Sequence, residues 1–231
     1  MSTCQENSHA GQPGFFDNKH SVEQLLYVGW FDIMGTQSSM RISLSKISNF
    51  IFKMYSYVSE ANNGGLEIYP LMDGFFATHK DKTTFFKFVD RFFSMIFLNF
   101  TSENRNEHKF MIRGGVAYGP VVVGKAMEHP YYFKDALLIG SPVVQAYAGE
   151  RQASPFGVYL DESIRTFPSA KESIPSVYYQ WKDYNLPQDI STNKYKKIEK
   201  YLNWCRDKSK LILYPEDRID EHLKLAKQYF G

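Results

Sequence analysis

Two aspartates at the ends of apolar runs are the residues best placed to do chemistry. Asp32 follows the apolar run 27–31, and Asp73 stands before a glycine between two further apolar runs. A pair of carboxylates can hold two divalent cations roughly 3.5–4 Å apart, which activate an attacking oxygen and stabilise a leaving phosphate. Because all the ligands are oxygen atoms, Mg²⁺ or Mn²⁺ is expected, two ions per site. Taken singly, Asp32 also fits a strand-end or capping residue, and Asp73 a plain hairpin-turn residue.

The residues after Asp32 suit a phosphate group. Gly35 allows the backbone to approach phosphate oxygens closely, and the polar residues that follow open an expected helix. The start of a helix offers free N–H groups and the positive end of its dipole. Strand, aspartate, glycine turn and helix together predict a place that holds a metal ion and a triphosphate.

Hydrophobic periodicity and turn residues predict the elements that position these aspartates. The expected strands are apolar runs bounded by turn residues, at 23–33, 66–71, 75–79, 110–117, 121–124, 156–160 and 177–182. Tyr118-Gly119-Pro120 is expected to join the fourth strand to the fifth, and Asp73 lies in the hairpin between the second and third. The expected helices are 38–61, 82–100, 136–150 after a Gly140-Ser141-Pro142 start, a short one capped by Asp161, 192–208 and 215–230.

The first six of these elements run strand, helix, strand, strand, helix, strand. That order predicts an α+β, ferredoxin-like (split βαβ) core, with further pieces after it. In this topology the end of the first strand lies beside the hairpin of the next two, so Asp32 and Asp73 are expected to face each other across one pocket. We divide the chain into a polar tail at 1–20, a core domain at 21–190 and a C-terminal helical extension at 191–231.

Bulk composition excludes several other classes. The chain has 231 residues, is 43% hydrophobic and 16% aromatic, and carries a net charge of +2. A full core is therefore available, and no basic field points to nucleic acid. The most apolar long segment, 83–100, contains Lys87, Asp90 and Arg91, which argues against a membrane span. Most of its phenylalanines are expected to be ordinary core, with an interface between subunits as their alternative role. With no signal-peptide pattern and two distant cysteines, a cytoplasmic protein is expected.

Four segments in order carry a resemblance to a known family: FDIMG, LMDGFFATH, IRGGVAYGPVVVG and LIGSPVVQAYAGERQASPFGVYLD. Together they resemble the ordered motifs of class III nucleotide cyclases, over residues 25–165. The resemblance implies an enzyme that converts a nucleoside triphosphate to a 3′,5′-cyclic nucleotide and pyrophosphate. It also implies a homodimer whose active sites are assembled from both subunits.

Residue by residue, the resemblance assigns roles in the site. Asp32 and Asp73 would be the metal carboxylates, and the backbone carbonyl of Ile33 a further metal ligand. Gly35, Thr36 and the amides after them would bind the triphosphate.

The chain departs from the purine cyclases at the positions that read the base. Four residues before the second metal aspartate, where those enzymes carry lysine or glutamate, stands Tyr69. Three residues before Gly140, where a polar residue is usual, stands Leu137. The family's transition-state asparagine and arginine fall on Val144 and Ala148, neither of which can replace them. The chain therefore lacks the adenine-reading pattern.

This pattern is similar to that of the bacterial Pycsar pyrimidine cyclases, whose AYxxE-like segment matches 146–150, followed by Ala153 and Pro155. The resemblance implies conversion of UTP to cyclic UMP as an antiphage signal, read by a separate effector protein. Cyclic CMP from CTP stays open. A bulky Tyr69 would shorten the base pocket and offer one hydroxyl to a pyrimidine. The alternative for Tyr69 is a strand aromatic that packs against a neighbour.

Because the usual arginine is missing, another cation is expected to stabilise charge on the phosphates. Arg113 is the preferred candidate, with a structural salt bridge as its alternative role. Arg151 is the second candidate, and Lys182 and Lys125 are weaker ones.

Three functions follow from the sequence. The first is a pyrimidine nucleotide cyclase. The second is a catalytically inactive, cyclase-like module that binds a nucleotide or a partner, which the missing asparagine and arginine favour and the retained aspartates oppose. The third, a palm-type nucleic-acid binder, is disfavoured by the near-neutral charge.

Overall fold

The computed structural model of this chain describes residues 21–36, 43–125, 136–166, 178–179, 188–207, 214 and 216–231. The expected tail at 1–20 and the candidate cation Lys182 lie outside these residues. So do the first residues of the expected helix at 38–61. For Lys125, the backbone is described and the side chain is not.

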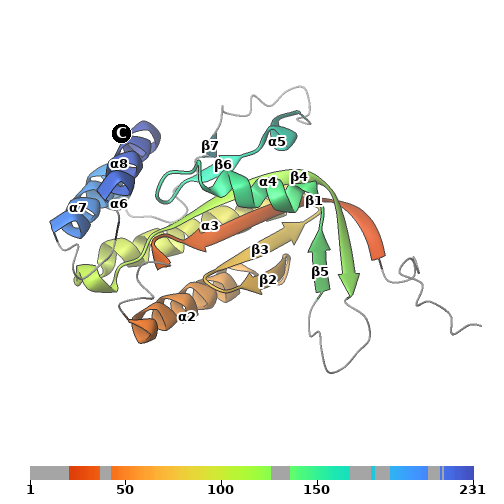
Figure 1. Cartoon of the computed structure of the whole chain (residues 1–231), viewed down its shortest axis with the longest axis horizontal. Helices are drawn as coiled ribbons and strands as arrows, with labels where there is room; N and C mark the ends of the chain where they lie inside the picture. The colour runs from red at the N-terminus through yellow and green to blue at the C-terminus, as the bar shows by residue number, and fades with distance from the viewer. Residues whose placement is uncertain are drawn as a thin grey trace, which may run out of the picture.

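The described strands form one sheet around a long first strand (Figure 1). The strands are β1 (Ser21–Ile33), β2 (Glu67–Leu71), β3 (Gly74–His79), β4 (Ile112–Lys125), β5 (Ala136–Ile139), β6 (Val158–Leu160) and β7 (Tyr178–Tyr179). Their order is β2-β3-β1-β4-β6-β7, with β5 paired to β4 as well. The neighbours in β2-β3-β1-β4 are all antiparallel. This arrangement confirms the predicted α+β, ferredoxin-like core.

The helices divide between the two faces of the sheet and one end of it (Figure 1). They are α2 (Leu44–Ala61), α3 (Lys82–Ser102), α4 (Ser141–Glu150), α5 (Glu162–Thr166), α6 (Gln188–Ser191), α7 (Lys194–Asp207) and α8 (Glu216–Phe230). Buried residues of α2 and α3 share a core cluster with one face of β1, whereas Ala146 of α4 packs with the opposite face.

Alternation along β1 explains these two faces. Phe31 faces α3, and its ring lies 6.1 Å from that of Phe92 on this helix and 5.3 Å from that of Phe75 on β3, centroid to centroid. The predicted core role of the α3 phenylalanines is confirmed, since those buried are Phe85, Phe88, Phe92, Phe93, Phe97 and Phe100. Phe86 is partly buried against the same cluster.

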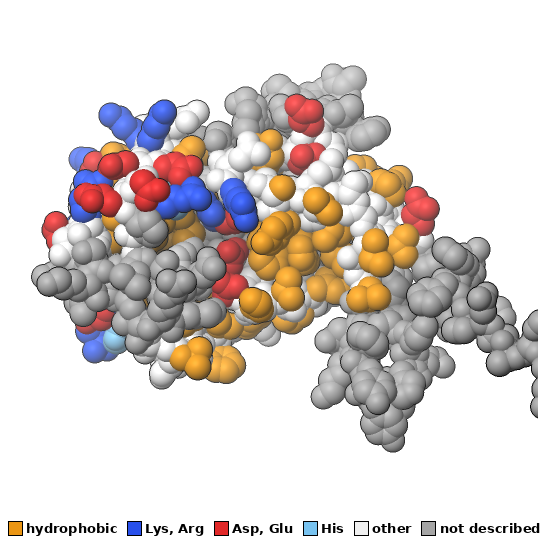
Figure 2. Space-filling view, viewed as in Figure 1, with side chains coloured by type: hydrophobic (Ala, Val, Ile, Leu, Met, Phe, Trp, Pro, Cys, Tyr) orange, Lys and Arg blue, Asp and Glu red, His pale blue; other side chains and the backbone are white. Residues whose placement is uncertain are grey.

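The opposite face of the sheet is covered less completely. Leu26, Val28 and Trp30 of β1 point to this side and are buried under α4. Beyond them, apolar side chains of α4, β5 and the β2–β3 hairpin are exposed, namely Leu71, Met72, Leu137, Ile139, Val144 and Tyr147. Figure 2 shows apolar side chains gathered over α4 and β5, and charged side chains over α7 and α8. We call this exposed set the apolar face.

Two expectations about β4 and β5 are wrong. The segment through Tyr118-Gly119-Pro120 is no junction, because β4 pairs with β1 without a break from Ile112 to Gly124. Pro120 has no N–H to donate, but it lies between the stretch of β4 that pairs with β6 and the stretch that pairs with β5. On that edge of β4 no described strand pairs with Pro120, so the strand tolerates it. Residues 136–139, expected as the start of a helix, form β5 instead.

The start of α2 is also later than expected. Ser43 has extended backbone angles and caps the helix, with its side chain accepting a hydrogen bond from the Lys46 N–H at 3.3 Å. The predicted cap of α5 is confirmed, since Asp161 accepts from the Ser163 N–H at 2.9 Å.

The C-terminal helices share a core with the rest of the fold. Ile198 and Leu202 of α7 and Ile219 of α8 belong to the same buried cluster as the α3 phenylalanines. The ring of Tyr201 lies 5.2 Å from that of Phe100, edge to face. The division at residue 191 stays a prediction. Within the described residues, no helix combines the length and apolar character that crossing a bilayer requires.

Candidate active site

Asp32 and Asp73 lie side by side, as the topology predicted. Asp32 is the next-to-last residue of β1, and its register partner on β3 is Gly74. Asp73 occupies the turn before that glycine, and its carbonyl accepts a hydrogen bond from the Ile33 N–H at 3.3 Å. Tyr55 of α2 holds this turn in place by donating its hydroxyl hydrogen to the Gly74 carbonyl at 2.6 Å. The two carboxylates therefore sit on fixed backbone at the end of the sheet.

The environment of Asp32 is unfavourable for an isolated carboxylate. Its Oδ1 is buried and has no hydrogen-bond partner among the described residues. Burial, and then the charges of Asp73 and Glu150, raise the pKa of Asp32 from 3.8 to about 8. A buried, unpartnered carboxylate oxygen beside a second carboxylate is a position that a cation would stabilise.

The turn after Asp32 requires its glycine. Gly35 has a φ of +78°, in the left-handed region that glycine enters without penalty. Thr36 follows, and its hydroxyl donates to Oδ2 of Asp73, with the carbonyl of Ile33 3.4 Å from the same hydroxyl. The turn thereby brings Ile33, Thr36 and Asp73 to one point.

A pocket of about 480 Å³ opens in front of this turn. Of the sequence-predicted site residues, it brings together Asp32, Ile33, Gly35, Thr36, Asp73, Arg113 and the second candidate cation Arg151. Further lining residues come from β1, α4 and the C-terminal segment, namely Trp30, Tyr147, Glu150, Tyr214, Arg218 and His222.

The donor set fits divalent cations of the magnesium type. Within the described chain, no three His, Cys, Asp or Glu side chains gather at one point, so no all-protein cage exists there. Magnesium is commonly held by one or two carboxylates together with substrate phosphates and water. Asp32 and Asp73, with the Ile33 carbonyl beside them, match that pattern. These residues would hold the ions.

Arg113 lies opposite Asp32 in the β1–β4 register and reaches the same pocket. Its Nε donates to Oε1 of Glu150, at the end of α4, in an ion pair whose side chains are 16% and 7% exposed. Burial raises the pKa of Glu150, and Arg113 opposes that rise. The predicted alternative role of Arg113, a structural salt bridge, is thus present together with its place in the pocket.

The approach of α4 to the sheet depends on a second glycine. A Cβ at Gly115 would lie 2.2 Å from the Ala146 carbonyl oxygen and 2.6 Å from the Glu150 nitrogen. Only a residue without a Cβ lets α4 come close enough for Glu150 to meet Arg113.

The C-terminal segment contributes residues that the sequence reading missed. His222 of α8 has its Nε2 3.3 Å from Nη1 of Arg113, and its Nδ1 2.5 Å from the hydroxyl oxygen of Tyr214. One signal was available: Ile219, Ala226 and Tyr229 form a buried face at helical spacing, and His222 is the single charged-type residue in it.

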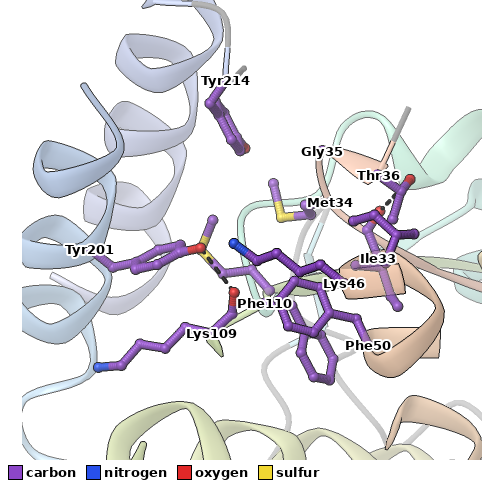
Figure 3. Close-up of a pocket in the computed structure, with 12 residues that line it drawn as sticks. Ile33, Met34, Gly35, Thr36, Lys46, Phe50, Lys109, Phe110, Tyr201 and Tyr214 are labelled. Carbon is purple, nitrogen blue, oxygen red and sulfur yellow. Dashed lines mark hydrogen bonds between the residues drawn. The ribbon is translucent and has the colours of Figure 1, made fainter. Parts of the chain in front are cut away.

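A small cavity of about 30 Å³ lies behind the turn (Figure 3). Gly35 and Thr36 line one side of it, and Tyr201 and Tyr214 the other. The Tyr201 hydroxyl donates to the carbonyl of Lys109 at 3.0 Å. The turn is therefore packed from behind by the C-terminal helices.

The residues predicted to read the base do not line this pocket. Tyr69 lies on the edge strand β2 and donates its hydroxyl hydrogen to Oε2 of Glu67 at 2.6 Å. Leu137 lies on β5 with half of its surface exposed. Val144 and Ala148 are exposed on α4. One chain therefore brings the phosphate-binding candidates together and leaves the base-binding candidates apart.

Comparison with known proteins identifies the fold. No protein-family model and no curated protein matches the sequence. Solved structures do. A non-canonical dimeric guanylyl cyclase domain of the RhoGC fusion protein from the aquatic fungus Blastocladiella emersonii is 18% identical, with a TM-score of 0.53, over 63% of this chain and 84% of that one.

Two further structures agree. The guanylate cyclase domain of RhGC from Catenaria anguillulae, in complex with GTP, is 15% identical with a TM-score of 0.53, over 63% of this chain and 82% of that one. A bacterial light-regulated adenylyl cyclase is 13% identical with a TM-score of 0.54, over 65% of this chain and 47% of that one. The chain therefore has the fold of a class III nucleotide cyclase catalytic domain.

Proposed function

We propose that this chain is a nucleotide cyclase that converts a pyrimidine nucleoside triphosphate, UTP first, to a 3′,5′-cyclic nucleotide and pyrophosphate. The observation that carries the proposal is the buried, unpartnered Oδ1 of Asp32 beside Asp73, at the start of a glycine turn. The fold supports it, because similar structures are cyclase domains and one of them binds GTP. Arg113 lies opposite Asp32 in the β1–β4 register and lines the same pocket. Its positive charge supports a polyphosphate ligand.

The pocket residues would divide the work. The 3′-oxygen attacks the α-phosphorus, the bond to the pyrophosphate oxygen breaks, and the hydroxyl proton leaves to solvent. Two divalent cations, held by Asp32, Asp73 and the Ile33 carbonyl, would supply positive charge at the hydroxyl and at the phosphates. The Gly35–Thr36 backbone would bind the triphosphate, and Arg113 would donate hydrogen bonds to phosphate oxygens as charge moves to the leaving group.

The base would be bound by a second copy of the chain. Tyr69 and Leu137 lie outside the pocket of their own chain, so a complete site needs these residues from a partner. The apolar face supplies a surface for that partner, since Val144 is 69% and Ile139 58% exposed. We propose a homodimer with two equivalent composite sites.

Pyrimidine choice and biological role rest on resemblance. At position 69 the purine cyclases carry lysine or glutamate. A tyrosine there would shorten the base pocket, which supports a pyrimidine, with UTP first and CTP as the alternative. As in the pyrimidine cyclases it resembles, the product would serve as an antiphage signal in the cytoplasm, read by a separate effector protein.

The activity test uses purified chain with ATP, GTP, CTP and UTP, each with Mn²⁺ or Mg²⁺, and detection of pyrophosphate and cyclic product by mass spectrometry. We expect cyclic UMP as the main product. Asp32→Ala and Asp73→Ala should each lower the rate on the order of 100-fold or more. Glu60→Gln, an exposed carboxylate of α2, is the matched control and should leave the rate unchanged. Activity that survives both aspartate variants would overturn the assignment.

Base choice has its own test. Tyr69→Lys should reduce the preference for UTP over ATP, measured as the ratio of kcat/KM values, whereas Tyr69→Phe should change it less. An unchanged ratio in Tyr69→Lys would remove this residue from the base pocket.

A second function has specific support. Val144 and Ala148 replace the polar transition-state pair of purine cyclases, which favours a module that binds nucleotide without turnover. Triphosphate binding without product from any of the four nucleotides would select it.

A further inference from the structure

We propose that α8 completes the phosphate end of this pocket, with His222 as a positioning residue that holds the Arg113 guanidinium toward the substrate. The inference rests on the proposed function, and it adds to it a part of the chain outside the four cyclase-like segments. His222 follows the last of those segments by more than fifty residues in the sequence. It nevertheless lies in the same pocket as Asp32 and Asp73.

The hydrogen-bond chemistry fixes how His222 contacts Arg113. A guanidinium can only donate, so Nε2 of His222, 3.3 Å from Nη1, must be the acceptor. The ring hydrogen then sits on Nδ1 and is donated to the Tyr214 hydroxyl oxygen at 2.5 Å. The hydrogen bonds thus run in one direction, from Arg113 in the pocket to His222 and from His222 to Tyr214.

The guanidinium is held from two helices at once. Nε of Arg113 bonds Glu150 from α4, and Nη1 bonds His222 from α8. Two fixed contacts on a planar group define the direction of its remaining N–H bonds. A fork fixed in this way loses little conformational entropy when it binds phosphate oxygens.

A neutral histidine suits this purpose. Burial, followed by the charge of Arg113, lowers the pKa of His222 from 6.5 to about 4. The other charged groups that face it are Arg218 and Glu221 of α8, which act in opposite directions. A neutral acceptor orients Arg113 and leaves its positive charge undiminished for the substrate, whereas Glu150 partly offsets it.

Tyr214 anchors this series of hydrogen bonds in the core. It is 8% exposed, lines both the front pocket and the cavity behind the turn, and its ring lies 3.4 Å from where a Cβ on Gly35 would be. The same side chain therefore touches the triphosphate turn and orients His222.

A purely structural role does not explain why a histidine occupies position 222. The face of α8 toward the core is otherwise made of Ile219, Ala226 and Tyr229. An apolar residue at position 222 would fill the same face without the cost of burying an imidazole. The polar ring stands at the point where the helix lines the pocket.

The experiment compares His222→Phe, which removes the acceptor and keeps a ring, with His222→Gln, whose side-chain carbonyl can still accept from Arg113. His222→Phe should lower kcat/KM for UTP roughly 10- to 100-fold, as loss of a supporting contact does. His222→Gln should stay within roughly 3-fold of wild type. Lys224→Ala, on the exposed side of α8, is the control. Equal losses in the Phe and Gln variants, with unchanged thermal unfolding, would overturn the proposal.

A double-mutant cycle tests whether His222 acts through Arg113. In the Arg113→Lys background, adding His222→Phe should cost far less than in the wild type, because the guanidinium it orients is gone. Full, additive losses would contradict the positioning role. Tyr214→Phe, which keeps the ring and removes only the hydroxyl, should show a smaller loss with the same dependence on Arg113.

A binding measurement separates this inference from the proposed function. Inorganic triphosphate with Mg²⁺, followed by calorimetry, tests the phosphate end without base or turnover. His222→Phe should weaken its binding and His222→Gln should not, whether or not the wild type forms a cyclic product. Wild-type affinity in His222→Phe would overturn the inference even in an active enzyme, while no product from wild type would overturn the proposed function alone.

Discussion

At the scale of single residues, the half-buried Asp32 and the buried His222 lie in one pocket, and their pKa values are shifted in opposite directions. Burial and then the charges of Asp73 and Glu150 raise the pKa of Asp32 to about 8, whereas burial and then Arg113 lower the pKa of His222 to about 4, so that between these two values both groups are mostly neutral in the absence of ligand. For Asp32 that neutrality is what a cation would reverse. For His222 it is what allows Nε2 to accept a hydrogen bond from Arg113.

The histidine predicts a dependence of stability on pH. Its pKa is about 4 when folded and 6.5 when unfolded, so between these values the unfolded chain binds more protons. Stability then rises with pH, its full contribution is present above pH 6.5, and it is lost as pH falls toward 4. The loss amounts to about 3 kcal/mol at most.

Urea unfolding of wild type and His222→Gln from pH 4 to 7, without divalent cations, measures this effect. Asp32 has the opposite sign, because a raised carboxyl pKa lowers stability as pH rises from 3.8 to 8. Since Asp32 is common to both proteins, their difference isolates the histidine. A difference that does not change with pH would contradict the burial of a neutral imidazole at this position.

The residues that sequence alone could place were those in local motifs. Asp32, Gly35 and Asp73 each stand at a strand end or in a turn. Hydrophobic periodicity and turn glycines in the sequence predict both kinds of position. Glu150 and His222 meet Arg113 only through tertiary packing, 37 and 109 residues away. No local pattern encodes such contacts, although the histidine in an apolar helix face was a visible hint.

At the scale of elements, the site depends on how closely α4 approaches β4. Gly115→Ala should destabilise the fold by about 1–3 kcal/mol, because the added methyl meets backbone atoms of α4 that cannot move aside singly. It should also lower activity, since α4 carries Glu150.

Chemical denaturation and turnover of the same preparation check this expectation. Gly65→Ala is the control, because the nearest atom to its new methyl is the Thr84 Cγ2 at 3.1 Å, at the end of a side chain. A Gly115→Ala protein as stable as wild type would show that α4 can shift without cost.

The sequence predicted the core elements and their order but misjudged β4 and β5. Pro120 and Gly119 resemble a turn, yet β4 continues because β1 pairs with it through both residues. Residues 136–139 are too few to show a period of their own, and their strand state comes from pairing with β4. In both places a long-range ladder overrides the local signal.

At the scale of the whole molecule, the apolar face is the candidate dimer surface. Val144→Asp places a charge on this face and should weaken association on the order of 10- to 100-fold, because burying an unpaired charge is unfavourable. Activity should fall in parallel.

Sedimentation velocity across a concentration series, with activity measured at the same concentrations, follows both effects. Phe52→Asp is the matched control, since Phe52 is 72% exposed on α2, on the other side of the sheet. If Phe52→Asp weakened association as much as Val144→Asp, the apolar face would not be the interface.

The distance between the phosphate-binding and base-binding candidates has a genetic consequence. Asp32→Ala and Tyr69→Lys would damage opposite halves of a site, so two defective copies could complement each other. In a mixed dimer both lesions would fall in one site, which leaves the other site intact. After random exchange of equal amounts, roughly one quarter of all sites would be restored. Co-expression of the two variants should therefore give more UTP turnover than either variant gives alone.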